Sequence, residues 1–323
     1  MQASRPLLPD ARRAWQFLQD RQVDGGFTGK SGKGGPDLYY TVFGLECQLA
    51  LGHQPAWESL VSYLSSFGQG ENLDFIHQTC LLRCWANVPG GMALRGTGVP
   101  PVSSPVLGRP QQREKTHGRD AHATPNAHAT SDAAALARLE SNRGADGGYS
   151  VLPGGGGSIY ACFLAMGAYM DRTVAMPDPD RVAACMDSLR TGDGAYANEA
   201  ALPIGTLPAT AAAVAIQLYL GRQVDPRLLG WMLSCQAREG GLAAFPHWRA
   251  DLLSTATGLF AIGQLPGGQP ATAPIRQRCT DFVLGLWNKS GSFRSDSGMS
   301  EAYLDCEYLW YGLLALGCLA KHD

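Results

Sequence analysis

Four residues near the C-terminal end combine carboxylates with a thiol: Glu301, Asp305, Cys306 and Glu307. Carboxylates that are held close together raise one another's pKa, and general acid catalysis exploits this effect. Asp305, Cys306 and Glu301 are therefore the candidate catalytic residues. Glu307 is a further partner for Asp305 in a carboxylate-dependent hydrolysis.

Other candidates lie at the starts of apolar helical stretches. Asp37, Asp74 and Asp251 each precede such a stretch, where a side-chain oxygen commonly caps the free backbone amides. His77 lies three residues after Asp74 and corresponds to Tyr40 in the first repeat, so both are expected to face a central cavity. A buried histidine that is bonded to a neighbouring side chain is the alternative interpretation of His77.

Aromatic side chains are frequent on or beside the same stretches. Trp248 and Tyr303 join Tyr40 and His77 as the residues expected to line the cavity. Aromatic lining suits a long apolar ligand.

Two alternating sets of helical segments must position these side chains. One set is amphipathic, and the other is apolar on nearly every side, as expected for helices buried on every side. Strict alternation predicts an all-α fold, an (α/α)6 toroid of six helical hairpins in one domain, without strands. The amphipathic segments are 9–21, 55–67, 132–142, 179–190, 226–237 and 274–288, and the apolar segments are 38–51, 74–87, 158–170, 206–220, 251–263 and 301–318.

A repeated glycine turn that ends in an aromatic residue supports this prediction. Self-similarity at a regular period is typical of repeat architectures. Each turn is expected to join an outer helix to an inner one. The five turns are Asp24–Phe27, Asp146–Tyr149, Asp193–Tyr196, Gly240–Phe245 and Ser290–Phe293.

Composition excludes several classes of function. A net charge of −2 gives no electrostatic reason to expect nucleic acid as a partner. The nine dispersed cysteines, without a CxxC pair, indicate reduced thiols and a cytoplasmic protein. No membrane span is expected, because the apolar runs are too short or interrupted.

A segment at about 88–131 lacks apolar periodicity and is rich in Pro, Gly, Arg and His. The stretches 95–103 and 116–124 can be encoded by nearly reverse-complementary DNA. We therefore interpret the segment as a disordered insertion in the toroid that has no chemical role.

Two motifs resemble protein prenyltransferase β subunits, especially those of the Rab geranylgeranyltransferase type. The first is Leu228-Leu229-Gly230-Trp231 with Gly240-Gly241-Leu242, and the second runs from Gly25-Gly26-Phe27 to Gly44. Outside the insertion, the resemblance covers nearly the whole chain. It extends more distantly to squalene and hopene cyclases, and it implies a toroid that acts on or binds an isoprenoid.

The resemblance also implies a zinc site. In that family, an Asp, a Cys two residues later and a His hold Zn²⁺, which activates the acceptor thiol. These positions fall on Asp251, Leu253 and Asp305. Asp251 and Asp305 are thus the candidate metal ligands. Leu253 cannot bind a metal, and zinc usually takes thiolate and imidazole ligands.

The prenyl-diphosphate pocket of the family has no cationic counterpart here, although a diphosphate needs cationic donors. The Asp-x-Asp-Asp acid of the cyclases is also absent. Three functions remain open: isoprenoid or protein prenyl transfer, non-catalytic binding of an apolar ligand or a protein partner, and carboxylate-dependent hydrolysis. The residues at the diphosphate positions are Pro203, Phe245, Trp248 and Ser254.

Overall fold

The computed structural model describes residues 1, 4, 6–29, 34–89, 126–298, 300 and 303–320, with residues 126–132 described by their backbone alone. Most of the predicted insertion, residues 90–125, lies outside the described residues, as does Glu301. None of the described helices is long and apolar enough to cross a membrane.

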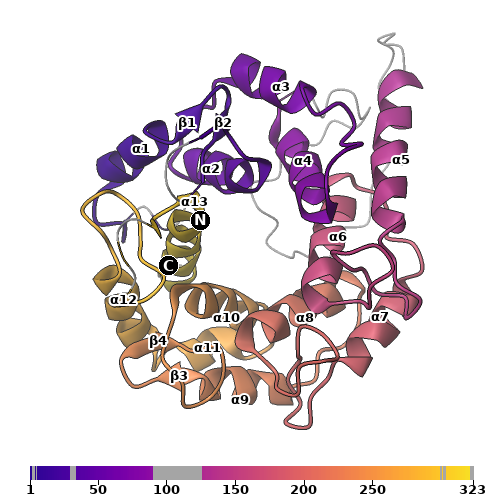
Figure 1. The fold of residues 1–323 in the computed structure, drawn as a ribbon. Coiled ribbons are helices and arrows are strands. Elements are labelled where there is room, and N and C mark those ends of the chain that lie inside the picture. Colours follow the sequence, from indigo (N-terminus) through magenta and orange to yellow (C-terminus); the bar gives the residue numbers. More distant parts are fainter. Residues whose placement is uncertain are drawn as a thin grey trace, which may run out of the picture.

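Six apolar helices form a closed inner ring (Figure 1). Each packs against the next one along the chain, and the last packs against the first. The ring is possible because these helices have apolar residues around most of their circumference. They are α2 (Leu38–Ala50), α4 (Phe75–Asn87), α6 (Ile159–Asp171), α8 (Leu207–Tyr219), α10 (Leu252–Gln264) and α13 (Cys306–Leu319).

A second set of helices surrounds this ring, so the predicted toroid of six hairpins is confirmed (Figure 1). Two details differ from the prediction. The third outer helix begins at Asn126 instead of 132, and a short helix, α11 (Gly268–Thr272), follows the fifth hairpin. The outer helices are α1 (Ala11–Gln19), α3 (Trp57–Ser65), α5 (Asn126–Glu140), α7 (Pro179–Ser188), α9 (Arg227–Ser234) and α12 (Arg276–Gly285).

The glycine turns are short antiparallel hairpins or single bridges, which the prediction of a strand-free chain missed. Strands β1 (Gln22–Val23) and β2 (Gly26–Phe27) pair in the first turn, and β3 (Gln236–Ala237) and β4 (Gly240–Leu242) pair in the fourth. The other three turns close with one bridge each. All five turns contain a glycine with positive φ, a conformation that costs residues with a Cβ about 1–2 kcal/mol.

The fourth turn ends differently from the prediction. Counted from its positive-φ glycine, Gly240, the position of the aromatic ring belongs to Leu242, which is fully buried. Phe245, the predicted residue, lies three residues further on and is only partly buried. The four aromatic residues in the other turns are buried: Phe27, Tyr149, Tyr196 and Phe293.

Each of these turns is tied to the inner helix that follows it. In three repeats, the backbone amide of the buried residue donates to a threonine hydroxyl in the first turn of that helix. The N–O distances are 2.9 Å to Thr41, 3.0 Å to Thr210 and 2.8 Å to Thr255. The turn therefore fixes the position at which the inner helix begins.

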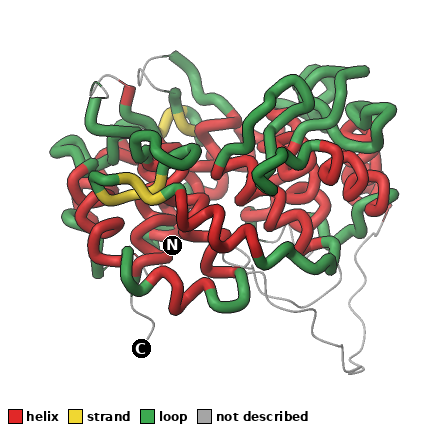
Figure 2. The backbone as a smooth tube through the Cα atoms, turned by 90° about the horizontal axis from the view of Figure 1, so that it is seen from below, coloured by secondary structure: helices red, strands yellow, loops and turns green. Residues whose placement is uncertain are grey.

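Every inner helix begins with a side-chain cap, which confirms the capping interpretation of Asp37, Asp74 and Asp251. The cap accepts a hydrogen bond from a backbone amide that has no partner within the helix. Long connections gather at these N-terminal ends, on one face of the ring (Figure 2). The caps are Asp37, Asp74, Ser158, Thr206, Asp251 and Asp305.

Candidate functional site

Tyr39 and Tyr311, from two neighbouring inner helices, lie beside Glu307 near the N-terminal ends of the ring. The hydroxyl of Tyr39, on α2, donates to Oε1 of Glu307, on α13, over 2.9 Å. Burial raises the pKa of Tyr311 well above its ordinary value, and the charge of Glu307 and a hydrogen bond with it add to this rise. Both tyrosines and Glu307 are partly exposed.

Tyr160 lies at the start of the inner helix on the opposite side of the ring. It lies on α6, which is separated from α13 by α8 and α10 in one direction and by α4 and α2 in the other. Burial first, and then the charges of Cys80 and Glu307, raise the pKa of Tyr160 to about 12. Tyr160 is 38% exposed. Tyr39, Tyr160, Tyr311 and Glu307 are called the phenol cluster below.

An aromatic wall continues from the phenol cluster along α2 and α13. Phe43 is its centre, because its ring centroid lies 5.0 Å from that of Tyr39, 5.6 Å from that of Trp310 and 6.2 Å from that of Tyr311. All four side chains are partly exposed although they belong to inner helices. The wall therefore offers apolar area that the protein itself does not cover completely.

A partly buried ion pair joins α2 to α4 further along the ring. Nε of Arg83, on α4, is 2.7 Å from Oε1 of Glu46, on α2, and Nε1 of Trp310 donates to Oε2 of Glu46 over 2.6 Å. The charge of Glu46 is the main cause that raises the pKa of Arg83, ahead of the opposing effect of burial. The two charges are therefore compensated within the ring.

His77 lies between two carboxylates at the starts of α2 and α4. Its Nδ1 is 2.9 Å from Asp74, and its Nε2 is 3.2 Å from Oδ2 of Asp37. Burial alone would lower the pKa of His77, but hydrogen bonds and charges from Asp74 and Asp37 outweigh it and raise the pKa. His77 thus joins the two caps through an imidazole that is readily protonated.

The comparisons with known proteins agree with this architecture. A family model described as the prenyltransferase alpha-alpha toroid domain matches residues 4–82 and 209–319, more than half of the chain. The chain belongs to the prenyltransferase alpha-alpha toroid family. No curated protein sequence matches it.

Solved structures of a type II terpene cyclase, MstE from Scytonema, share the fold of this toroid. A variant of MstE in complex with geranylgeranyl dihydroxybenzoate gives a TM-score of 0.57 at 14% identity. The match covers 99% of this chain and 96% of the MstE chain. MstE without ligand gives a TM-score of 0.56 at 14% identity, and the match covers 99% of this chain and 97% of the MstE chain. At this identity, the likeness concerns the fold alone.

The zinc positions of the family hold residues with other partners in this toroid. Asp251 accepts from the backbone N and from Oγ of Ser254, both over 2.7 Å, and fully buried Asp305 accepts from the amide of Tyr308 over 3.0 Å. Leu253 supplies no ligand. Within the described part of the chain, no group of three His, Cys, Asp or Glu side chains could hold a metal ion. These residues do not fit zinc.

The other predicted site residues are spread over the toroid. Cys306 is fully buried, and burial, the largest cause, raises the pKa of its thiol to about 12. Trp248 is 61% exposed in the loop before α10 and packs against Phe245, whereas Tyr303 is 57% exposed in the loop before α13. Tyr40 lies on α2, where it contacts Tyr39 edge-on. The structure therefore brings Tyr40 near the phenol cluster but places Trp248 and Tyr303 in the loops.

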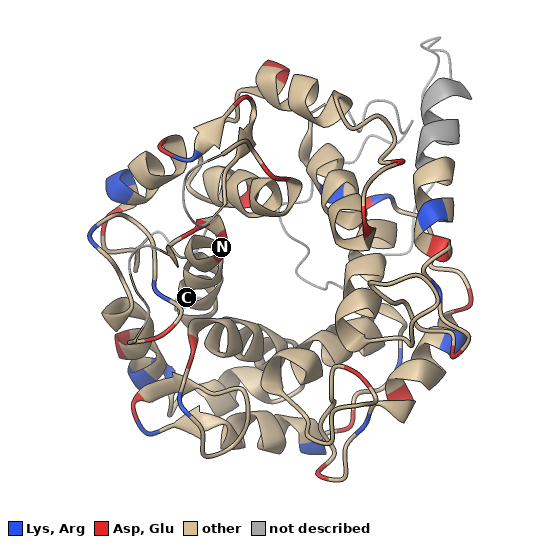
Figure 3. Ribbon diagram, in the orientation of Figure 1, with Lys and Arg blue, Asp and Glu red and all other residues tan. Residues whose placement is uncertain are grey.

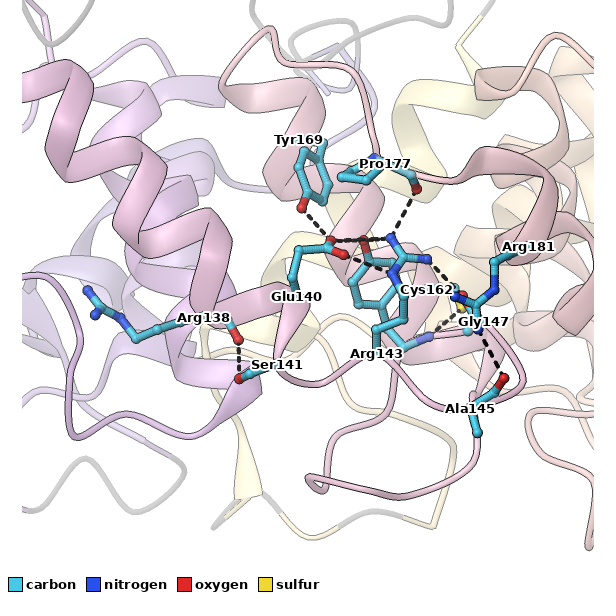
Figure 4. A network of polar contacts seen from close by, with 12 residues as sticks. Arg138, Glu140, Ser141, Arg143, Ala145, Gly147, Cys162, Tyr169, Pro177 and Arg181 are labelled. Carbon is cyan, nitrogen blue, oxygen red and sulfur yellow. Dashed lines mark hydrogen bonds and ion pairs between the residues drawn. The ribbon is translucent and has the colours of Figure 1, made fainter.

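A second polar network is structural. Glu140, at the end of α5, binds the hydroxyls of Tyr149 and Tyr169 and lies 2.8 Å from Nε of Arg143 (Figure 4). Arg143 also donates to the carbonyls of Gly147 and Pro177. The network therefore anchors the second glycine turn, Asp146–Tyr149, to the helices on either side.

Sequence reasoning identified Glu307 only as a partner of Asp305, and it did not relate Glu307 to the tyrosines of the inner helices. A usable signal was present for Glu46 and Arg83, since each is a charged residue inside an otherwise apolar helical stretch. The phenol cluster had no such signal, because it joins helices on opposite sides of the ring.

Proposed function

We propose that this toroid binds an isoprenoid, or another long apolar ligand, against the aromatic wall of the inner ring. The observation that carries the proposal is the contact set of Phe43 with Tyr39, Trp310 and Tyr311, all partly exposed on inner helices. Aromatic side chains bury large areas, and apolar area removed from water contributes about 25 cal/mol per Å².

Family membership supports this ligand class. MstE, which shares the fold, has been solved with a geranylgeranyl-bearing substrate. In the present toroid, the aromatic wall on α2 and α13 offers partly exposed rings against which a hydrocarbon chain could lie.

Protein prenyl transfer has less support than the binding of an isoprenoid without transfer. The carboxylates at the zinc positions cap helices, and Leu253 stands where the family has a thiolate. The positions of the diphosphate pocket hold exposed Pro203 and Trp248 and buried Ser254. We therefore infer a role that does not depend on zinc and does not begin from a prenyl diphosphate.

Binding of geranylgeraniol, measured by calorimetry with the full chain, tests the proposal. The variant Phe43→Ala removes the centre of the wall and is expected to weaken binding about tenfold or more. Trp57→Ala, on outer helix α3, is the matched control and should bind as the wild type does. Thermal melts show whether either variant is folded. Equal affinities of wild type and a folded Phe43→Ala variant would contradict the proposal.

A further inference from the structure

The inner ring is poor in basic side chains. Its six helices contain only two, His77 and Arg83. Every other His, Lys and Arg lies outside the bounds of these helices. Most coloured segments in Figure 3 accordingly lie on the outer helices and in the loops. Within the same bounds there are three acidic side chains, Glu46, Asp171 and Glu307. Four of the six N-caps are also acidic: Asp37, Asp74, Asp251 and Asp305.

Both basic side chains already bind carboxylates. Arg83 lies 2.7 Å from Glu46, and His77 is held between Asp37 and Asp74. A diphosphate carries multiple negative charges and is normally held by several Arg or Lys donors. Beside Glu307 it would instead meet a carboxylate, and the repulsion between like charges in a partly buried site is costly.

The phenol cluster suits a different polar group. Glu307 is a strong hydrogen-bond acceptor, and the phenol of Tyr160 can both donate and accept. A ligand hydroxyl can donate to the carboxylate and accept from the phenol without bringing a charge into the ring. The aromatic wall begins beside this cluster at Tyr39, so an apolar chain that is attached to the hydroxyl would lie against Phe43 and Trp310.

We propose that the phenol cluster recognises a neutral hydroxyl at the head of the apolar ligand, and that the acidic inner ring rejects the corresponding diphosphate. This inference rests on the proposed function and specifies its ligand class: a free prenyl alcohol or phenol. It assigns the positioning of that hydroxyl to Glu307 and Tyr160.

Three probes with the same hydrocarbon chain separate the possibilities: geranylgeraniol, its methyl ether and geranylgeranyl diphosphate. Wild-type protein is expected to bind the alcohol about tenfold or more tightly than the ether, which cannot donate, because hydrogen bonds to charged groups are the strong ones. The diphosphate is expected to bind more weakly than the alcohol by at least the same factor.

Two variants test the assigned residues. Glu307→Gln keeps an acceptor for Tyr39 but removes the charge, so the preference for the alcohol over the ether should fall to about threefold. Tyr160→Phe removes the phenol hydroxyl and should weaken binding of the alcohol more than that of the ether. The controls Glu58→Gln, on α3, and Tyr219→Phe, at the end of α8, should retain the wild-type preference.

The outcomes are distinct. If none of the three probes binds, the proposed function fails, and this inference fails with it. If the alcohol and the ether bind equally well, or the diphosphate binds as tightly as the alcohol, the proposed function stands and the inference is wrong. A preference for the alcohol that is reduced in Glu307→Gln or Tyr160→Phe, but not in the controls, supports it.

Discussion

Arg83 and Glu46 form an ion pair between two neighbouring inner helices, with Nε and Oε1 2.7 Å apart. The side chain of Glu46 is only 9% exposed. Removing one member of a buried pair leaves an uncompensated charge. Loss of one partner should therefore cost more stability than replacement of both.

Glu46→Ala is expected to lower the free energy of unfolding by about 2 kcal/mol, since it leaves the Arg83 guanidinium, whose side chain is 33% exposed, and the Trp310 indole N–H without their acceptor. Urea denaturation measures the change. The double variant Glu46→Leu/Arg83→Met, which removes both charges, should recover much of the loss. A Glu46→Ala variant as stable as the wild type would show that the pair is dispensable.

His77 makes stability depend on pH. Its pKa is raised in the folded protein, so protonation stabilises the native state fully below the ordinary value of about 6.5. This stabilisation is lost as the pH rises through the raised pKa. In denaturation series from pH 5 to 9, His77→Gln is expected to remove this part of the decline. An unchanged pH profile in the variant would refute the assignment.

Gly291 tests the steric requirement of the glycine turns. It has a φ of +102°, and a Cβ there would overlap the carbonyl of Arg13, on α1. Gly221 has a φ of +68°, but no atom lies within 4 Å of its Cβ position. Both alanine variants suffer backbone strain of about 1–2 kcal/mol. Only Gly291→Ala must also displace a neighbouring helix, so its melting temperature should fall further than that of Gly221→Ala.

The variant Thr255→Val tests the hydrogen bond that links the fourth glycine turn to α10. Oγ1 of Thr255 accepts from the buried amide of Leu242 over 2.8 Å, and Thr255→Val leaves that amide unpaired at a cost of about 1–3 kcal/mol. Thr257, on the same helix, bonds only its own helix, to the carbonyl of Leu253. Thr257→Val should therefore cost less than about 1 kcal/mol in urea denaturation. Equal losses of unfolding free energy in Thr255→Val and Thr257→Val would show that the hydrogen bond between Thr255 and Leu242 does not stabilise the fold.

Much of the fold could be predicted from the sequence because its signals are local. Apolar periodicity located all six inner helices, and the capping positions of Asp37, Asp74 and Asp251 followed from side-chain type alone. The prediction for the fourth turn was wrong in one detail, because it took Phe245, a nearby aromatic residue, as the last residue of the turn. The register is set by the positive-φ glycine, which places buried Leu242 there.

The candidate site was less predictable because its contacts join residues that are far apart in the sequence, such as Tyr39 and Glu307. Asp305 looked reactive in sequence, yet its position at a helix start gives it a capping role. Tyr160 and Glu307 belong to helices on opposite sides of the ring, and no local pattern relates them. The distance between these two helices depends on the diameter of the closed ring, which is a property of the whole fold.

The packing of α13 against α2 gives the repeats no first or last member. An open stack of helical hairpins exposes an apolar face at each end and needs specialised terminal repeats. Here, each inner helix packs against a neighbour on both sides, so the unfolding of one hairpin removes packing contacts from two others. Unfolding is accordingly expected to spread around the whole circle instead of fraying inward from the ends.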